Sequence, residues 1–167
     1  KNVFRLLPGS YMVIRPNGEI NNSTFYSVSH NLINSNNKEI DYSGIENAIN
    51  ESIEMHTQSD VGYNIQLSGG LDSSYITAVL STKLEKRLNT FSVELPKCDK
   101  DEKYYQSIVV DKFNTSHSGH AFNSYDFAEN LPKATWHMDI PIIHGAGVFL
   151  MLLCEHSFKN SKVILTG

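Results

Sequence analysis

The chain has 167 residues, with 14 basic and 18 acidic side chains, a formal net charge of −4 and 40% hydrophobic residues. A chain of this length can bury one sizeable core but hardly two. No block of lysine or arginine could follow a phosphate backbone, which argues against a nucleic-acid partner. No apolar run approaches the ~20 residues that span a bilayer, which argues against a membrane protein. We therefore expect a soluble, cytoplasmic protein with one principal domain.

The cysteines and the two ends of the chain carry further expectations. Cys98 and Cys154 have neither C-x-x-C spacing nor a histidine partner at metal-ligand spacing, so a disulfide framework or a zinc site has little support. The chain starts at Lys1 without a signal-peptide pattern and stops on KVILTG, where a predicted strand meets its loop. We expect a piece of a longer protein, truncated at its C-terminal end.

The first forty residues predict a hairpin followed by a polar connection. YMVIRPNGEI carries an Asn-Gly turn signal at 17 and 18 between apolar runs, which is typical of a β-hairpin. Residues 21–37 are rich in asparagine and serine, which favours a linker or surface loop.

A helical pattern begins at Ser43. Ser43 and Glu46 have the spacing of a capping box, and Ile45, Ile49 and Ile53 recur every fourth residue. These features predict an amphipathic helix that starts near Ser43.

From residue 63 onward, predicted strands and helices alternate. We expect strands at 63–67, 88–95, 116–122 and 162–166, and helices at 73–86, 101–113, 125–137 and 147–158. Such alternation implies right-handed βαβ crossovers and an α/β fold, with a mainly parallel sheet covered by helices on both faces. The ligand of such a sheet lies at the carboxyl ends of its strands.

The stretch QLSGGLDSSY at 66–75 lies at such an end, between the first predicted strand and the first long helix. A helix N-terminus presents unpaired N–H groups and the positive end of the helix dipole, and Gly69 and Gly70 place no Cβ in the way of an anion. Serine hydroxyls in the same string can donate to phosphate oxygens. Gly-Gly turns with polar caps also open helices that bind nothing, but the complete string after a strand favours a phosphate site.

Asp72 is the residue of this string whose charge opposes a phosphate. An anionic side chain beside a phosphate is favourable mainly when a cation bridges the two, and magnesium is the obvious candidate. The string has no Walker lysine. We therefore expect a magnesium-dependent nucleotide site of another kind.

At this point the sequence resembles a family. SGGLDSS looks like the pyrophosphate-binding loop of the ATP pyrophosphatases, which cleave ATP to AMP and pyrophosphate. LPGSYMVIRPNGEI at 7–20 resembles the last hairpin of the glutaminase domain of glutamine-dependent asparagine synthetases. TFSVEL, DEKYYQSIVVDKF, DIP and KVILTG then follow in the order found in that family's synthetase domain.

The resemblance covers nearly the whole chain and implies an adenine nucleotide alpha hydrolase-like fold. It implies three parts: a hairpin remnant of the glutaminase domain at 1–28, a linker at 29–42, and a nucleotide-binding synthetase domain at 43–167. The implied cofactors are ATP and Mg²⁺. The implied activity is that of an AMP-forming ligase, which activates a carboxylate as its adenylate and forms an amide with glutamine-derived ammonia.

The resemblance also implies site residues. It makes Asp72 a catalytic residue and magnesium ligand, and it makes Thr166 and Gly167 the start of a second nucleotide loop. Leu67 and Val93 would contact the adenine and ribose, although apolar strand residues are also typical of a core. The implied pyrophosphate loop consists of Ser68, Gly69, Gly70, Leu71, Asp72, Ser73 and Ser74.

Several other polar residues are ambiguous. Asp101 and Glu102 match an acidic pair common in the family, but a pair that opens a helix is equally explained by the helix dipole. His117 and His120 have odd spacing on a predicted strand, so they face opposite sides and cannot readily share a metal ion. We interpret both histidines as structural.

The acceptor side shows departures from the family. His137, Asp139 and His144 flank the turn where the family places its acceptor pocket. Asparagine synthetases can bind the aspartate carboxylate with an arginine there, but MDIPIIHGAG at 138–147 contains no arginine. The expected acceptor is aspartate or a relative, and the missing arginine leaves open a carboxylate other than aspartate. The family's nucleophilic N-terminal cysteine and its Gly-x-x-Asp-Glu continuation are also missing, so we expect this piece alone to be inactive.

Alternative functions stay open from the sequence. One is an adenylating enzyme of another class with the same loop, such as a tRNA-modifying enzyme, although the acidic balance argues against RNA. Another is a non-catalytic nucleotide-binding module. The expected partners are ATP, a carboxylate acceptor, ammonia from the missing glutaminase domain and, in a homodimer, a second copy.

Overall fold

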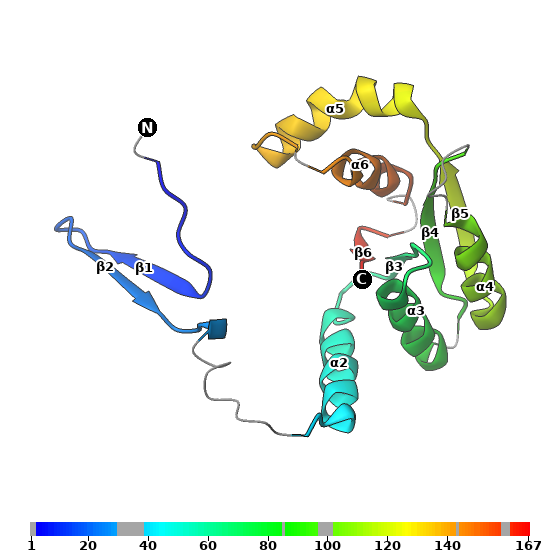
Figure 1. Ribbon diagram of the computed structural model, residues 1–167, viewed down its shortest axis with the longest axis horizontal. Helices are drawn as coiled ribbons and strands as arrows, with labels where there is room; N and C mark the ends of the chain where they lie inside the picture. Colours follow the sequence, from blue (N-terminus) through cyan, green and yellow to red (C-terminus); the bar gives the residue numbers. More distant parts are fainter. Residues whose placement is uncertain (1–2, 30–38, 85, 97–101, 143, 158–160) are drawn as a thin grey trace. The chain divides into compact units, whose positions relative to one another are not determined.

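The computed structural model describes residues 3–29, 39–84, 86–96, 102–142, 144–157 and 161–167. It divides into two compact units, Lys1–Ser43 and Gly44–Gly167 (Figure 1). Lys1, Cys98, Asp101 and most of the expected linker at 29–42 lie outside the described residues.

The first unit contains the expected hairpin. Strands β1 (Ser10–Ile14) and β2 (Ile20–Thr24) pair antiparallel, with Ile14 opposite Ile20. Gly18 has a φ of +84°, and its N–H donates to the carbonyl of Arg15 at 2.9 Å. The expectation of a loop from residue 21 is wrong for 21–24, which belong to β2. Pairing with β1 satisfies the backbone there, although every side chain of β2 is exposed.

The second unit contains the alternating helices and strands that the sequence predicts, with bounds within a few residues of those expected. Its strands are β3 (Tyr63–Gln66), β4 (Asn89–Glu94), β5 (Ser116–Ala121) and β6 (Val163–Leu165). Its helices are α2 (Tyr42–His56), α3 (Leu71–Lys83), α4 (Lys103–Phe113), α5 (Ser124–Met138) and α6 (Ala146–Ser157). Helix α2 begins at Tyr42, so Ser43 lies inside the helix. The capping-box pattern predicts Ser43 as the N-cap, and this prediction is wrong.

The four strands form one parallel sheet in the order β5-β4-β3-β6 (Figure 1). β4 and β5 are added on one side of β3, and β6, the last strand in the chain, pairs on its other side. The chain order therefore reverses at β3. In open parallel sheets, the crevice at such a reversal is where ligands bind.

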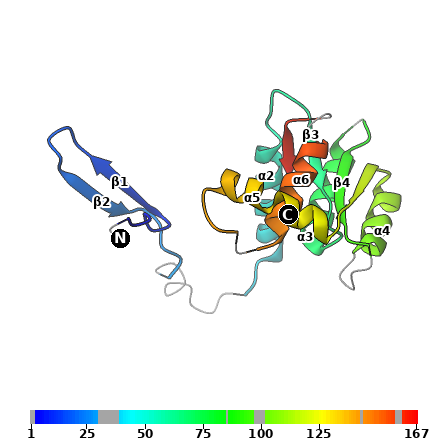
Figure 2. The ribbon, with the colours of Figure 1, turned by 90° about the horizontal axis from the view of Figure 1, so that it is seen from above.

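Helices cover both faces of this sheet, as expected for the α/β class (Figure 2). Tyr63 and Ile65 of β3 pack in one core cluster with Ile53 of α2 and Leu80 of α3. Asn64, which lies between them on β3, points to the other face, since its Nδ2 donates to the carbonyl of Ser157 at the end of α6.

A second cluster lies on that other face. It joins α5 and α6 through Phe122, Ala134, Val148 and Leu152, with Val93 of β4 packed against it. The two clusters fix helices on opposite faces of the sheet. Because β3 and β4 are parallel, the loops that follow them open at the same edge.

Among the described residues, no helix is both long enough and apolar enough to cross a membrane.

Candidate functional site

The turn from β3 into α3 is held by two serines. The Oγ atoms of Ser68 and Ser73 lie 2.9 Å apart, and the N–H of Ser68 donates to Ser73 Oγ at 3.2 Å. The N–H of Gly70 donates to Ser68 Oγ at 3.2 Å. Ser73 is buried. The two hydroxyls thus close the turn from inside and set its shape.

The glycines of the turn differ in what they contribute. Gly69 has a φ of +88°, a conformation that residues with a Cβ rarely adopt. Gly70 is the N-cap of α3 and, having no side chain, cannot cap the first N–H groups of the helix. The N-terminus of α3 therefore has no side-chain cap, and the helix dipole and the first N–H groups of a helix favour an anion there.

A cavity of about 370 Å³ lies beside the turn, at the carboxyl ends of β3 and β4. Its volume is within the range of about 300–1,000 Å³ typical of small-molecule sites. It is lined by Gln66, Leu67, Ser68, Val93, Leu95, Glu102, Gln106, Gly145, Ala146, Phe149 and Leu150. The structure thus brings the predicted residues Leu67, Ser68 and Val93 together around one cavity.

The wall of this cavity includes residues that sequence reasoning missed. Phe149 and Leu150 come from α6, whose apolar sequence predicts a core helix and gives no signal of a cavity. Gln106 of α4 likewise has no signal in the sequence. Glu102, which the helix dipole alone could explain, also lines the cavity and is exposed.

The end of β6 meets the same turn. A Cβ built on Gly167 would lie 2.5 Å from the backbone N of Ser73 and 2.7 Å from the backbone C of Asp72. Only a glycine fits so close to the first turn of α3. The loops that follow β3 and β6, far apart in the sequence, therefore converge at the N-terminus of α3.

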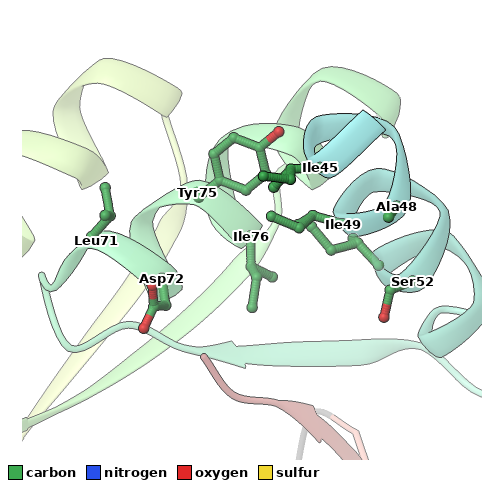
Figure 3. Close-up of a pocket in the computed structure, with 9 residues that line it drawn as sticks. Ile45, Ala48, Ile49, Ser52, Leu71, Asp72, Tyr75 and Ile76 are labelled. Atoms are coloured by element: carbon green, nitrogen blue, oxygen red, sulfur yellow. The ribbon is translucent and has the colours of Figure 1, made fainter. Parts of the chain in front are cut away.

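Asp72 and Leu71 lie on the first turn of α3 and are both exposed. They line a separate groove of about 680 Å³ between α2 and α3, with Ile45, Ile49 and Ile76. In Figure 3, Asp72 lies at the loop end of α3, away from the isoleucines of α2. Among the described residues lining this groove, Asp72 is the only charged one.

The three residues assigned to an acceptor pocket do not gather at the strand-end cavity. His137 lies in the last turn of α5, and Asp139 is the C-cap of that helix, with a φ of +54°. Asp139 lines a different hollow with Trp136 and Pro141. His144 is exposed just before α6, next in the chain to the cavity residue Gly145.

The two histidines of β5 face opposite sides of the sheet, as predicted. His117 Nδ1 lies 3.0 Å from Thr90 Oγ1, whereas the ring of His120 stacks on Phe91, the next residue of β4. Burial lowers the pKa of both histidines, and the neighbouring His156 lowers that of His120 further. His120 Nε2 is buried and has no hydrogen-bond partner in the described part of the chain. Both side chains are packed between elements, which fits a structural role.

Comparison with known protein families gives a match to asparagine synthase over residues 44–167, the second unit in full. The chain belongs to the asparagine synthase family. Residues 44–167 are its synthetase domain, and the resemblance drawn from the SGGLDSS loop and its neighbouring segments is confirmed.

Two asparagine synthetases and an amidase are similar to this protein along much of the chain. Asparagine synthetase [glutamine-hydrolyzing] 1 of Bacillus subtilis is 27% identical over 166 residues, 99% of this chain and 26% of the relative. A putative asparagine synthetase of Methanocaldococcus jannaschii is 36% identical over 119 residues, 70% of this chain and 23% of the relative. Amidase chyE of Penicillium rubens is 25% identical over 190 residues, 100% of this chain and 28% of the relative. The chain thus spans about a quarter of the length of these relatives.

A solved structure supports the fold. NMN synthetase from Francisella tularensis has a TM-score of 0.51 and 12% identity, covering 75% of this chain and 54% of that one. The expected adenine nucleotide alpha hydrolase-like fold of this asparagine synthase domain is confirmed.

The magnesium that the family implies can be tested against the donor atoms of the site. No group of three or more His, Cys, Asp or Glu residues in the described ranges could hold a metal ion by itself. Mg²⁺ at nucleotide sites uses one or two carboxylates together with substrate phosphates and water. One exposed carboxylate, Asp72, beside an open helix N-terminus fits a phosphate-bound magnesium ion and does not fit a protein-made cage.

Proposed function

We propose that this chain is the ATP-binding synthetase region of an asparagine synthetase-like amidotransferase. In this reaction a carboxylate is activated as its adenylate with release of pyrophosphate, and glutamine-derived ammonia then forms an amide. The observation that carries the proposal is the turn of Ser68–Ser74, closed by the Ser68–Ser73 hydroxyl pair and open at the N-terminus of α3 beside the strand-end cavity. Membership in the asparagine synthase family supports it.

The position of each residue supports a proposed role. Leu67 and Val93 offer an apolar surface for the adenine and ribose at the strand ends. The backbone N–H groups at the start of α3, with the hydroxyls of Ser68 and Ser74, would hold the pyrophosphate. Thr166 and Gly167 would close the site from β6. A bound magnesium ion, held by Asp72, would neutralise charge on the departing pyrophosphate.

The chemistry divides into two steps. A carboxylate oxygen attacks the α-phosphorus of ATP, and the bond from that phosphorus to the bridging oxygen breaks, so pyrophosphate leaves with the electron pair. Ammonia then attacks the carboxyl carbon of the adenylate, AMP leaves and the amide nitrogen loses a proton to solvent. The helix dipole and the oriented N–H groups stabilise charge that grows on the leaving pyrophosphate, which is where a preorganised site lowers the barrier most.

The acceptor is aspartate or another small carboxylate in this proposal. In the family resemblance an arginine would grip aspartate, and the segment 138–147 contains none. His137 lies in the last turn of α5 and Asp139 lines a different hollow, so His144, next to Gly145, is the acceptor-pocket candidate closest in the chain to the cavity.

The test uses the full-length protein with ATP, Mg²⁺, glutamine or ammonium, and a panel of carboxylates headed by aspartate. We expect AMP and pyrophosphate in equal amounts and one amide product. Formation of ADP and orthophosphate would overturn the reaction type. Absence of carboxylate-dependent ATP–pyrophosphate exchange with every acceptor would favour a non-catalytic nucleotide-binding module, and adenylation of RNA would favour a tRNA-modifying enzyme.

A further inference from the structure

Gln106 is a buried polar residue that the site described above does not yet use. It lies on the first turns of α4 and is 3% exposed. A long polar side chain is rarely buried unless its hydrogen-bonding groups have partners. Its surroundings therefore indicate what it does.

The side-chain amide of Gln106 reaches two carbonyl oxygens from two different strand ends. Nε2 lies 3.4 Å from the carbonyl oxygen of Ser68 and 3.5 Å from that of Val93. Both partners are acceptors, so the NH₂ end of the amide must face them. Ser68 begins the pyrophosphate turn, and Val93 lies near the end of β4. One amide thus links the two strand ends that flank the cavity.

The same residue also packs against the turn itself. A Cβ built on Gly69 would lie 3.0 Å from the backbone N of Gln106 and 3.3 Å from its Cγ. Helix α4 therefore packs against the turn at Gly69, the residue with the positive φ. Gln106 touches the pyrophosphate turn by hydrogen bonding at Ser68 and by close packing at Gly69.

Asn64 is a natural comparison within the same domain. It is also a fully buried amide whose nitrogen donates to a backbone carbonyl, that of Ser157 at 3.1 Å. The Asn64 Oδ1 and the Gln106 Oε1 are both buried without a hydrogen-bond partner among the described residues. Asn64, however, ties β3 to the end of α6 and does not line the strand-end cavity.

We propose that Gln106 is a positioning residue, which holds the pyrophosphate turn at Ser68 and Gly69 in a fixed place relative to the end of β4. The inference rests on the proposed function for its catalytic consequence. The physical reason is that a turn can stabilise a leaving pyrophosphate only if its N–H groups are already oriented, and small displacements weaken such preorganisation. Gln106 does not need to touch the nucleotide to act in this way.

The test compares Gln106→Met with Asn64→Leu in the full-length protein. Met keeps the length of the side chain and removes its N–H donors, so we expect kcat/KM for ATP to fall about tenfold. Hydrogen exchange measured by mass spectrometry should speed up at the amides of Ser68 and Gly70. Asn64→Leu should lower the unfolding temperature while it changes kcat/KM and exchange in the turn by less than about twofold.

A further variant and the wild-type protein distinguish failure of this inference from failure of the proposed function. Gln106→His retains an N–H donor at the end of the side chain, so it should recover a large part of the loss, and it carries the test if Gln106→Met does not fold. Equal effects of the Gln106 and Asn64 variants on kcat/KM and on exchange in the turn would overturn the inference. If the wild type shows no pyrophosphate exchange, the proposed function fails, whereas the hydrogen-exchange comparison still decides the role of Gln106.

Discussion

The hydroxyl oxygens of Ser68 and Ser73 lie 2.9 Å apart and join the end of β3 to the first turn of α3. Ser73 Oγ also accepts the backbone N–H of Ser68, which makes it the inner anchor of the turn. Because Ser73 is buried, water cannot easily replace this acceptor.

Ser73→Ala should therefore weaken both the turn and its binding of pyrophosphate. The N–H of Ser68 loses its acceptor, which costs about 1–3 kcal/mol in the free energy of unfolding. We expect kcat/KM for ATP to fall about tenfold or more, as measured by ATP–pyrophosphate exchange. Ser81→Ala is the matched control, because Ser81 Oγ donates to Thr77 on the same helix, away from the turn. A comparable loss of activity in both variants would contradict the assignment.

Gly69→Ala should disturb the turn through the backbone. The φ of +88° is strained for a residue with a side chain, and a Cβ there would lie only 3.0 Å from Gln106 N and Tyr105 Cβ, which would have to shift. The left-handed conformation alone costs about 1–2 kcal/mol. Gly62→Ala is the control, since a Cβ there would have no described atom within 4 Å. Urea unfolding of both variants should show a clear loss of stability for Gly69→Ala and little change for Gly62→Ala.

Asp72→Asn separates stability from chemistry. Asp72 is exposed on the first turn of α3, so its loss changes the free energy of unfolding by less than about 1 kcal/mol through the helix dipole. If Asp72 holds magnesium against the pyrophosphate, carboxylate-dependent exchange should fall about 100-fold or more. Asp111→Asn, an exposed carboxylate on α4, should leave exchange unchanged. Near wild-type activity of Asp72→Asn across a magnesium titration would remove the metal role.

The stability of the domain should decrease on acidification because of His117 and His120. Burial lowers the pKa of both in the folded state, while the nearby carboxylate of Glu94 opposes this shift. The unfolded chain therefore binds protons first, below a pKa of about 6.5. The stability that the neutral rings contribute is complete above that pH and is lost as the pH falls through the lower folded pKa values.

Urea unfolding between pH 8 and pH 5 measures this effect. His120→Phe keeps an aromatic ring against Phe91 and His156, which lie 6.1 and 4.5 Å away between ring centroids, but it cannot be protonated. It should flatten the fall in stability below pH 6.5. An unchanged slope in His120→Phe would show that His120 does not contribute.

Much of the site could be predicted from local sequence. The string from Ser68 to Ser74 carries its own turn chemistry, since Gly69 permits the positive φ and serine hydroxyls accept nearby backbone N–H groups. The alternation of strands and helices likewise predicts a parallel sheet, because parallel strands need crossovers and both faces must be covered. These features depend on residues close in the chain, so the sequence by itself determined the class of the fold and the position of the Ser68–Ser74 turn.

Only the tertiary structure decided which distant residues complete the site. The pairing of β6 with β3 places Gly167 against Ser73, and the packing of α4 places Gln106 between Ser68 and Val93. Neither contact has a local signal in the sequence, because a glycine at a strand end and a glutamine on a helix are both common. Their importance here comes from the close approach of segments that are distant in the chain. The order of segments in the sequence could not locate the strand-end cavity. The same long-range packing places His137 and Asp139 away from it.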